Sequence, residues 1–356
     1  MPPEAFPPEF CLQCPAPLAG GDTIQLAHGG GGRVMRALIE NLFRPAFAAG
    51  EGSLAPAHDS AVFEVGGGRL AFTTDTFVVS PLFFPGGDIG SLAVYGTVND
   101  LAMAGAEPVA LSAGFVLEEG LPIEVLERVV RSMRAAAREA GVPIVTGDTK
   151  VVDRGKGDGI FINTAGIGRV PPGIDISPQR VRPGDEILVT GDLGRHGIAI
   201  MSVREGITFE TELTSDCAPL SGLVRDLLST GAEVHCLRDL TRGGLAAALN
   251  EIAIDAGVGI ELDEAAIPVS EPVAAACEML GLDPLYVANE GRMVIFTPSS
   301  STNRVLERLR HHSAAPQPAV VGAVVESHPG LVELRGTLGA GRILDLLSGE
   351  QMPRIC

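Results

Sequence analysis

Acidic residues in the first half of the chain are spaced in a way that favours metal binding. Each stands at or near the end of an apolar stretch, where a side chain faces an open edge of the fold and not its core. Mg²⁺ takes one or two carboxylates from a protein and lets substrate phosphates complete its octahedron. Capping and turns also use Asp, so a single residue indicates little, but the set favours a metal–nucleotide site. Its members are Asp59, Asp75, Asp100 and Asp148, with Lys150 beside the last.

A second reactive group is the thiol of the terminal residue, Cys356. The segment 349–356 is expected to form an arm, because Gly349 loosens its base and Pro353 stiffens its course. Fully extended, it would reach roughly 26 Å, enough to enter a cleft on the same chain or a neighbour. The adjacent α-carboxylate disfavours a thiolate, so activation of the sulfur must come from wherever the arm docks. A disordered tail that happens to end in Cys is the alternative.

Glu290 is the third candidate group, in a turn at 289–292 between two apolar stretches. The stretches 284–288 and 293–297 are expected to be strands. A carboxylate in such a turn is either solvated or aimed into a cleft, and the turn itself leaves both interpretations open.

A glycine-rich turn, His28-Gly29-Gly30-Gly31-Gly32, separates a strand-like alternation at 23–27 from helical periodicity over 33–43. A turn of this kind that opens a helix presents free backbone N–H groups, which suit phosphate. The chain has no GxxxxGK[S/T] motif, and Met35 stands where a GxGxxG motif needs its third glycine. The turn is therefore either a phosphate lid or a mobile linker.

The composition points to a globular protein and excludes several classes of partner. Of the 356 residues 46% are apolar, and the net charge of −18 argues against nucleic acid and anionic membranes. The acidic, Pro-rich start is unlike a signal peptide, and no apolar run approaches the ~20 residues of a membrane span. Six cysteines in so long a chain predict a reduced, cytoplasmic protein. The single pair Cys11 and Cys14 is a weak zinc signal.

The elements that must position these groups alternate between strands and helices, which predicts an α/β or α+β fold. The expected strands are 69–74, 143–146, 186–190, 293–297 and 319–325, and the expected helices are 33–43, 88–97, 198–204 and 245–256.

The length predicts two domains, and a Pro/Gly-rich join marks the division between them. The expected parts are an irregular extension at 1–22, an N-terminal domain at 23–170, a linker at 171–185, a C-terminal α/β domain at 186–335 and a tail at 336–356.

Five short motifs are distributed along the chain: His58-Asp59-Ser60-Ala61, Thr73-Thr74-Asp75, Asn99-Asp100, Gly147-Asp148-Thr149 and Asp239-Leu240-Thr241-Arg242-Gly243-Gly244. Together they resemble the ATP-binding superfamily of aminoimidazole-ribonucleotide synthetase and selenophosphate synthetase. The resemblance extends from about residue 23 to the end of the chain. It implies a homodimer in which the N-terminal domains pair their sheets into a central β-barrel, with an α/β domain on each side.

The terminal Pro353-Arg354-Ile355-Cys356, with the glycine turn, narrows this resemblance to the branch that matures [NiFe]-hydrogenases. The branch implies that a partner carbamoyltransferase loads a carbamoyl group onto Cys356, and that ATP with Mg²⁺ drives its dehydration to an S-cyano group. The cyanide then passes to iron on a scaffold complex. Such chemistry needs an in-line phosphate and a base for the N–H protons.

The same resemblance implies a role for each candidate residue. Cys356 carries the reacting group, and Glu290 and Lys150 are the residues that handle protons. The expected metal ligands are Asp59, Asp75, Asp100 and Asp239, and the residues expected around ATP are His28, Gly30, Gly31, Asp59, Asp75, Asn99, Asp100, Asp148, Thr149, Lys150 and Asp239.

Two other functions remain open at this point. An enzyme of the same superfamily could phosphorylate a free small molecule such as thiamine monophosphate or selenide, but the terminal Cys356 and the lack of a Cys near the glycine turn speak against it. A binding module that docks its tail onto a partner would have no use for the clustered aspartates.

Overall fold

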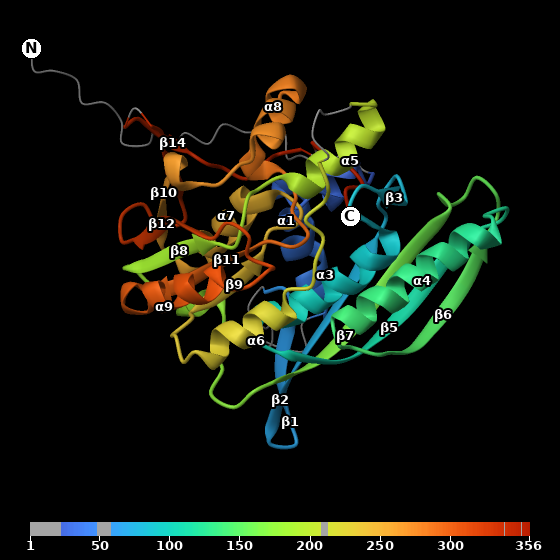
Figure 1. Ribbon diagram of the computed structural model, residues 1–356, viewed down its shortest axis with the longest axis horizontal. Helices are drawn as coiled ribbons and strands as arrows, with labels where there is room; N and C mark the ends of the chain where they lie inside the picture. The colour runs from blue at the N-terminus through green and yellow to red at the C-terminus, as the bar shows by residue number, and fades with distance from the viewer. Residues whose placement is uncertain (1–22, 48–57, 208–212, 338, 350) are drawn as a thin grey trace, which may run out of the picture.

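The described part of the chain forms two units, each built from a sheet and helices, as the mixed α/β prediction requires (Figure 1). The expected extension at 1–22, with Cys11 and Cys14, lies outside the described residues. Within the described residues, none of the helices is both long and apolar enough to cross a bilayer. The computed structural model describes residues 23–47, 58–207, 213–337, 339–349 and 351–356.

The N-terminal unit is a five-stranded sheet with strand order β1-β2-β7-β5-β6. Strands β5 and β6 are parallel, and the other neighbours are antiparallel. Helices α3 and α4 cover one face (Figure 1). Asp88 starts α3 by accepting hydrogen bonds from the N–H groups of Gly90 and Ser91. The elements are η1 (Leu26–Gly29), α1 (Arg33–Leu38), η2 (Ile39–Phe43), α2 (Arg44–Phe47), β1 (Ala61–Val65), β2 (Gly68–Phe77), β3 (Phe83–Phe84), β4 (Gly87–Asp88), α3 (Ile89–Met103), β5 (Glu107–Glu118), α4 (Ile123–Glu139), β6 (Ile144–Val152) and β7 (Ile160–Val170).

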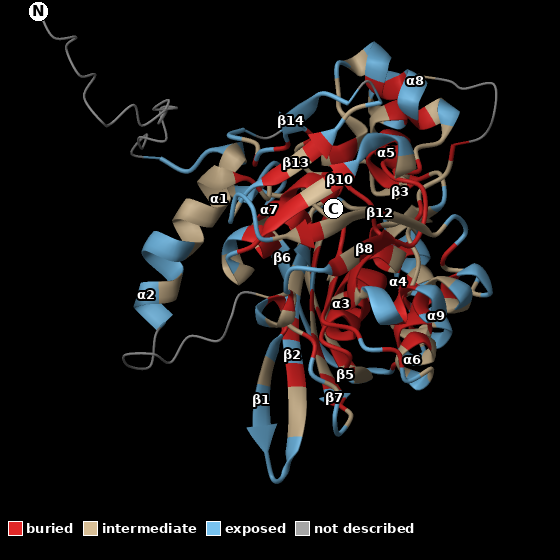
Figure 2. Cartoon of the chain, turned by 90° about the vertical axis from the view of Figure 1, so that its left-hand side faces the viewer, coloured by how far each residue is buried: buried red, intermediate tan, exposed pale blue. Residues whose placement is uncertain are grey.

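The opposite face of this sheet has no cover within the described chain. Phe72, Val109 and Val116 are 38–53% exposed, and β1 is exposed along nearly all of its length (Figure 2). The edge strand β6 is exposed at every position from Ile144 to Val151. An exposed apolar sheet face with a free edge strand is a common site of association with another chain.

The C-terminal unit is a seven-stranded sheet with strand order β14-β13-β10-β12-β8-β11-β9. Helix α7 packs on one face and helices α6 and α9 on the other. The end of α3 joins the second of these cores, so the two units are packed together. The elements are η3 (Pro178–Arg180), β8 (Asp185–Val189), α5 (Arg195–Glu205), α6 (Ser221–Ser229), β9 (Cys236–Asp239), α7 (Gly244–Ala256), β10 (Gly259–Asp263), η4 (Glu264–Ala266), α8 (Glu271–Leu280), η5 (Pro284–Tyr286), β11 (Met293–Pro298), α9 (Ser299–Arg310), β12 (Ala319–Val325), β13 (Val332–Arg335) and β14 (Gly341–Ile343).

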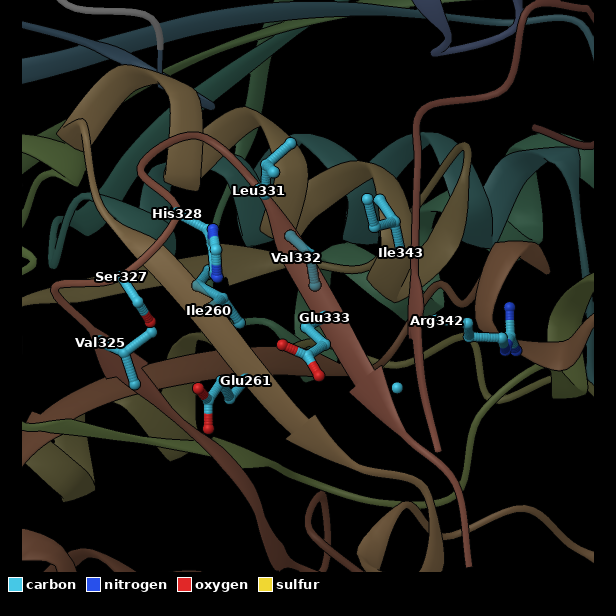
Figure 3. Close-up of a pocket in the computed structure, with 11 residues that line it drawn as sticks. Ile260, Glu261, Val325, Ser327, His328, Leu331, Val332, Glu333, Arg342 and Ile343 are labelled. Carbon is cyan, nitrogen blue, oxygen red and sulfur yellow. The ribbon is translucent and has the colours of Figure 1, made fainter. Parts of the chain in front are cut away.

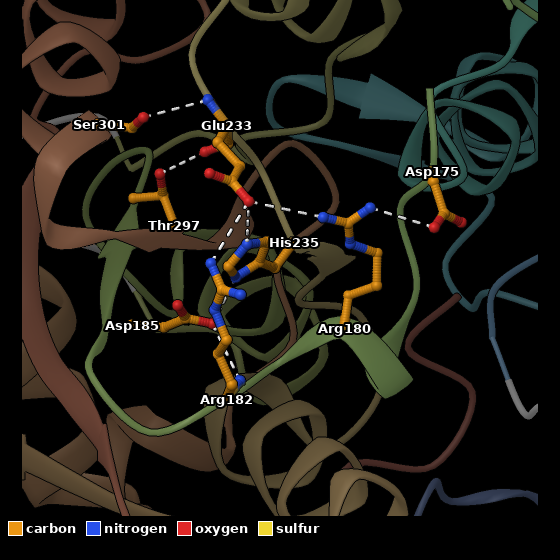
Figure 4. A network of polar contacts seen from close by, with 8 residues as sticks. All are labelled: Asp175, Arg180, Arg182, Asp185, Glu233, His235, Thr297 and Ser301. Atoms are coloured by element: carbon orange, nitrogen blue, oxygen red, sulfur yellow. Dashed lines mark hydrogen bonds and ion pairs between the residues drawn. The ribbon is translucent and has the colours of Figure 1, made fainter. Parts of the chain in front are cut away.

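A polar network ties the segment between the two units to the C-terminal sheet (Figure 4). Its centre is the fully buried ring of His235, whose nitrogens lie 2.7 Å from Asp185 and 2.9 Å from Glu233. Arg180 and Arg182 extend from the connecting segment to Glu233. Because both ring nitrogens of His235 have hydrogen-bond partners, the network stabilises the connection and offers no unpaired buried group for catalysis among these residues.

Several element ends differ from the sequence predictions. Strand β2 continues to Phe77, α3 to Met103 and β6 to Val152, so Asp75, Asn99, Asp100 and Asp148 lie inside elements and not at their ends. The strands predicted at 23–27 and 284–288 were wrong. The first region contains the turn η1, where Gln25 and His28 bond each other, and the second contains η5, where Asp283 caps Leu285.

Candidate active site

Three aspartates that lie far apart in the sequence meet between the two units. Asp59 precedes β1, Asp100 is in the last turn of α3, and Asp239 ends β9. Their carboxylate oxygens lie within 4.8 Å of one another. They line a cavity of about 400 Å³, together with Gly31, Thr73, Asp75, Arg238, Thr241, Arg242, Gly244 and Glu251.

Burial makes this cluster electrostatically unfavourable without a cation. It raises the pKa of Asp100 well above its usual range, and Asp239 and Asp59 add to the effect. Burial likewise raises the pKa values of Asp59 and Asp75, and that of Asp239 to about 6. Oxygens of Asp59 and Asp239 are buried without a hydrogen-bond partner in the described structure. Clustered carboxylates with unpaired oxygens are the ligands expected for Mg²⁺, so the residues fit that ion.

Basic side chains and one hydroxyl fix the aspartates in place. Arg238 Nε lies 2.9 Å from Asp59 and its other arm reaches Glu251. Burial alone would lower the pKa of Arg238, but Asp59 and Glu251 raise it, so the guanidinium stays charged. Thr73 Oγ1 donates to Asp100 at 2.7 Å. Neighbouring cations and donors therefore hold part of the cluster before any metal arrives.

Glu290 is buried, with 3% of its surface exposed, so it is not a solvated turn residue. Asp216 accepts hydrogen bonds from the N–H groups of Glu290 and Gly291, at 3.2 and 3.0 Å. Burial raises the pKa of Glu290 well above its usual range, and the charges of Asp239 and Asp75 raise it further. The carboxyl group therefore belongs to the same acidic environment as the cluster.

Asn99 serves the backbone and does not line the cavity. Its amide donates to the carbonyls of Ala218 and Glu290 and accepts from the N–H of Leu220 at 2.7 Å. Asn99 is thus a link between α3 and the Glu290 turn, and its expected contact with ATP stays a prediction.

The glycine turn lies at the edge of the cavity. Gly31 has φ +73°, and a Cβ there would lie 2.9 Å from the carbonyl oxygen of Arg242. Arg242 in turn donates to the carbonyl of Gly29. Gly31 lines the cavity, but His28 bonds to Gln25, and neither His28 nor Gly30 is among the lining residues.

The tail that carries Cys356 is docked against the body of the chain. Met352 and Ile355 are buried, at 5% and 3% exposure, in the core that also contains Ala288. The N–H of Val78 donates to the terminal carboxylate of Cys356 at 3.0 Å. Val78 follows Asp75 by three residues, or roughly 10 Å along an extended chain.

Lys150 and Asp148 lie apart from the cluster. They pair with each other at 2.6 Å on β6, and both side chains are 70% exposed. Asp148 pairs across the sheet with Gly114, Asn163 and Thr76 in turn, three strands and roughly 14 Å from the strand of Asp75. The expectation that Asp148 adjoins the other aspartates is wrong within one chain, because β6 is the far edge of the sheet. Lys150, on the same strand, is not among the residues that line their cavity. Thr149 lies with them on this strand.

Another hollow, of about 210 Å³, lies over β10, β13 and β14 (Figure 3). Apolar Val332 and Ile343 line it together with Glu261 and Glu333. Arg335 pairs with Glu261 at 2.8 Å. Among the described residues, the side chains placed to hold a metal ion are Asp59, Asp100 and Asp239, which lie outside this hollow. The candidate active site is therefore the cavity between the units.

Comparison with known proteins places the chain in a family. Residues 57–170 match the N-terminal domain and residues 182–333 the C-terminal domain of AIR synthase related proteins. "Carbamoyl dehydratase HypE" of Azotobacter vinelandii is 55% identical over 94% of this chain and 97% of its own length. The Escherichia coli protein of the same name is 49% identical over 94% and 100%. This chain belongs to the HypE family.

Solved HypE structures have the same fold. HypE in complex with ATP aligns with a TM-score of 0.79 at 47% identity, covering 94% of this chain and all of that one. HypE from a HypE–HypF complex aligns with a TM-score of 0.82 at 46% identity, covering 87% and 100%. The two-domain fold and the family expected from the motifs are therefore confirmed.

In this HypE-family chain, the structure brings together Asp59, Asp75, Asp100 and Asp239 in one cavity. It buries Glu290 close enough for Asp239 and Asp75 to add to the rise of its pKa, and it separates Asp148, Thr149 and Lys150 from the cavity. No sequence pattern assigned a role to the charged residues that surround the cluster. Arg238 and Arg242 flank Asp239 in or beside one of the motifs, and this signal could have found them. Nothing comparable marks Glu251 or Asp216, which reach the site from a helix interior and a loop.

Proposed function

We propose that this protein is a carbamoyl dehydratase of [NiFe]-hydrogenase maturation that converts an S-carbamoyl group on its own Cys356 into an S-cyano group. The observation that carries the proposal is the docked tail, which brings Cys356 beside β2 and the segment leading to Glu290 in the same chain. The relatives named carbamoyl dehydratase HypE support the same activity.

The proposed reaction balances as the transfer of one oxygen from carbon to phosphorus. The carbamoyl oxygen attacks the γ-phosphorus of ATP and ADP leaves. The C–O bond then breaks with loss of phosphate, and the two N–H protons depart as the C≡N bond forms. Carbamoyl sulfur plus ATP therefore gives cyano sulfur, ADP and phosphate, with no redox change and no free water produced.

ATP and Mg²⁺ fit the acidic cavity in this proposal. Asp59, Asp100 and Asp239, with Asp75 beside them, would hold the metal, whose chemistry is to neutralise phosphate charge and orient it for in-line transfer. Arg242 and the N-terminus of α7 at Gly244 line the same cavity and offer positive charge to phosphate. The existence of a solved HypE complex with ATP supports the nucleotide.

Glu290 is the proposed base. A buried carboxylate whose pKa is raised accepts a proton more readily once ionised than an ordinary glutamate does. Asp216 and Asn99 fix the backbone of its turn, which limits where the carboxyl group can point. The direction of the pKa shift and the burial support this role.

A second copy of the chain supplies Lys150 in this proposal. Lys150, Asp148 and Thr149 lie on a free edge strand, on or beside the uncovered sheet face that carries Phe72 and Val116. If two such sheets pair into a barrel, β6 of one protomer can approach the cavity of the other. The homodimer would therefore complete each active site.

The proposed partners follow from the needs of the reaction. A carbamoyltransferase must load Cys356, and the HypE–HypF complex among the solved relatives supports HypF in that role. An iron-carrying acceptor must receive the cyanide, which we assign to a HypC–HypD scaffold complex. We place the protein in the cytoplasm because its cysteines suit a reducing compartment.

The test is the mass of the C-terminal peptide after carbamoylated protein is incubated with Mg·ATP. Wild type should lose one water from Cys356, Cys356→Ala should never be loaded, and Glu290→Gln should bind ATP but keep the carbamoyl form. Formation of the cyano form by Glu290→Gln at the wild-type rate would remove Glu290 from the mechanism. Maturation of hydrogenase by Cys356→Ala in cells would refute the whole proposal.

A further inference from the structure

The main chain of the tail is held by a set of groups that we call the tail seat: Val78, Ser80, His196 and Arg204. The N–H of Val78 donates to the terminal carboxylate of Cys356 at 3.0 Å, and that of Ser80 donates to the carbonyl of Arg354 at 3.3 Å. The two side chains belong to helix α5 and bind the carbonyls of Pro353, Arg354 and Ile355. These contacts of the tail seat are therefore made to main-chain oxygens.

Arg204 is the centre of the tail seat. Its Nε donates to the carbonyl of Ser80 at 2.5 Å, Nη1 donates to that of Pro353 at 2.6 Å, and Nη2 donates to that of Arg354. One guanidinium thus joins the body of the chain to two successive tail residues. The fixed fork of an arginine can do this, whereas the single ammonium of a lysine cannot reproduce its geometry.

His196 is the second side chain, and it is fully buried. Its Nε2 lies 2.8 Å from the carbonyl of Ile355, so this nitrogen carries the proton and donates. Its Nδ1, 2.8 Å from Ser215 Oγ, accepts from that hydroxyl. The next residue, Asp216, binds the N–H groups of the Glu290 turn, so one short segment contacts both the tail seat and Glu290.

The side chain of Arg354, in the tail itself, binds an acidic residue of the body of the chain. This tail residue has φ +56°, in the left-handed region, and its guanidinium pairs with Asp158 and donates from Nε to the carbonyl of Val78. Burial lowers the pKa of Arg204, and the nearby charge of Arg354 lowers it further. Arg354 is itself paired with Asp158, so an acidic partner balances its charge when the tail is docked.

We propose that Arg204 and His196 are positioning residues that hold the main chain of Pro353 to Ile355 and so keep Cys356 at the reaction site. The inference rests on the proposed function for its catalytic consequence, but the seat itself is a binding property. Because the contacts described for the seat are to main-chain oxygens, we expect it to hold the tail whether the sulfur is a free thiol or carries a carbamoyl or cyano group.

The experiment compares Arg204→Ala and Arg204→Lys with wild type in the full-length protein, with Arg131→Ala as the matched control. Arg131 is exposed on α4 and pairs with Glu127, so its loss changes net charge equally without touching the tail. Hydrogen exchange of the amides of Val78 and Ser80, read from a peptide that spans them, reports whether the tail is seated. A peptide from the β8–β11 core checks that the fold is intact.

Arg204→Ala should speed exchange at Val78 and Ser80 by roughly tenfold or more, because a charged donor to two tail carbonyls is lost. Arg204→Lys should give a smaller increase, and Arg131→Ala none. The single-turnover conversion of carbamoylated protein should slow in the same order while nucleotide affinity stays within about twofold of wild type. Carbamoylated and uncarbamoylated wild type should show equal protection.

Unchanged exchange at these two amides in Arg204→Ala, with the core peptide intact, would overturn the tail seat. If Arg204→Ala loosens the core as well, Ser215→Ala replaces it, since this variant removes the hydroxyl that orients His196 and otherwise accepts from the N–H of Cys217 at 3.0 Å. It should also speed exchange, and unchanged protection would again overturn the inference. A wild-type protein that exchanges slowly but never forms the cyano group would refute the proposed function and leave the seat standing.

Discussion

The aspartates of the active site are held together against their own repulsion. Asp59, Asp100 and Asp239 are buried within 4.8 Å of one another, and their pKa values are raised. A folded state that raises the pKa of an acid is more stable when that acid is protonated. The stability contribution is therefore fully present below the unfolded pKa and is lost as the pH rises through the folded pKa, which for Asp239 is about 6.

Asp100→Asn should consequently stabilise the metal-free protein while it impairs function. At pH 8 we expect the midpoint of thermal unfolding to rise by roughly 2–4 °C, with a smaller change at pH 5, because the amide removes a destabilised charge. Calorimetry should show Mg·ATP binding weakened by roughly tenfold or more, and Asp75→Ala should weaken it too. Asp175→Ala, outside the acidic cavity, is the control, and unchanged nucleotide affinity in both site variants would contradict the assignment.

The pKa of Glu290 predicts the pH dependence of the reaction. Since burial and the charges of Asp239 and Asp75 raise that pKa, the base is increasingly protonated as the pH falls below it. The single-turnover rate of carbamoylated protein should therefore rise with pH, by about tenfold per unit below the pKa, and then level off. A rate that does not change between about pH 5 and pH 8 would exclude a titrating Glu290 as base.

At the level of elements, apolar periodicity found most strands and helices but misjudged where they end. Strand β6 was expected to stop at Thr146, whereas it continues through Asp148 and Lys150 to Val152. Alternating Thr, Asp and Lys residues on an exposed edge strand resemble a turn in the sequence, because no buried residue reveals the period of two. The position of Lys150 could not be predicted for the same reason.

The acidic cluster was predictable only in part. Positions at the ends of apolar stretches indicated Asp59 and Asp100, and the motif resemblance added Asp239. The distances between them depend on how the two units pack, which no local pattern encodes. Buried ion pairs across that boundary, such as Arg238 with Asp59, join residues 179 positions apart and leave no periodic signal. The motif that contains Asn99 suggested a place beside ATP, but it gave no sign that this side chain links α3 to the Glu290 turn.

The uncovered sheet face should be the dimer interface. Phe72→Asp would place a charge among apolar side chains from both copies, and we expect it to weaken dimerisation roughly 100-fold or more. Ile254→Asp on α7 is the control, because Ile254 is also 45% exposed but belongs to the C-terminal unit. Sedimentation equilibrium should give a dimer for wild type and control and a monomer for Phe72→Asp. A dimeric Phe72→Asp would move the interface elsewhere.

On the scale of the whole molecule, we predict that each site is shared between two protomers, since Lys150 lies on an edge strand away from the acidic cavity of its own chain. Inactive Glu290→Gln and Lys150→Ala proteins should then complement each other when their subunits are mixed. Half of the dimers would be mixed, each with one intact site of two, so activity should recover to about a quarter of wild type. The measurement is cyano formation after subunit exchange.

Complementation has a clear negative outcome. If Lys150 acts within its own chain, each mixed dimer contains two defective sites, and no activity returns. Mixing Glu290→Gln with Cys356→Ala is the negative control, because no site in the mixed dimer combines an intact Glu290 with a tail thiol. Lys150→Ala mixed with Cys356→Ala should regain activity, because the second chain supplies Lys150.

The docked tail also makes the reaction independent of the concentration of a free substrate, because the reacting sulfur is part of the chain. An enzyme that carries its reacting sulfur on a short tether meets it at an effective concentration set by geometry, on the order of millimolar for a flexible link and higher for a seated one. Diluting the loaded protein should leave its turnover per site unchanged, as long as the dimer persists. The rate of cyanide supply in the cell would then depend on how often Cys356 is carbamoylated and how often its cyano group is transferred. The protein would act as a carrier that modifies the group it carries, and not as a catalyst for a free substrate.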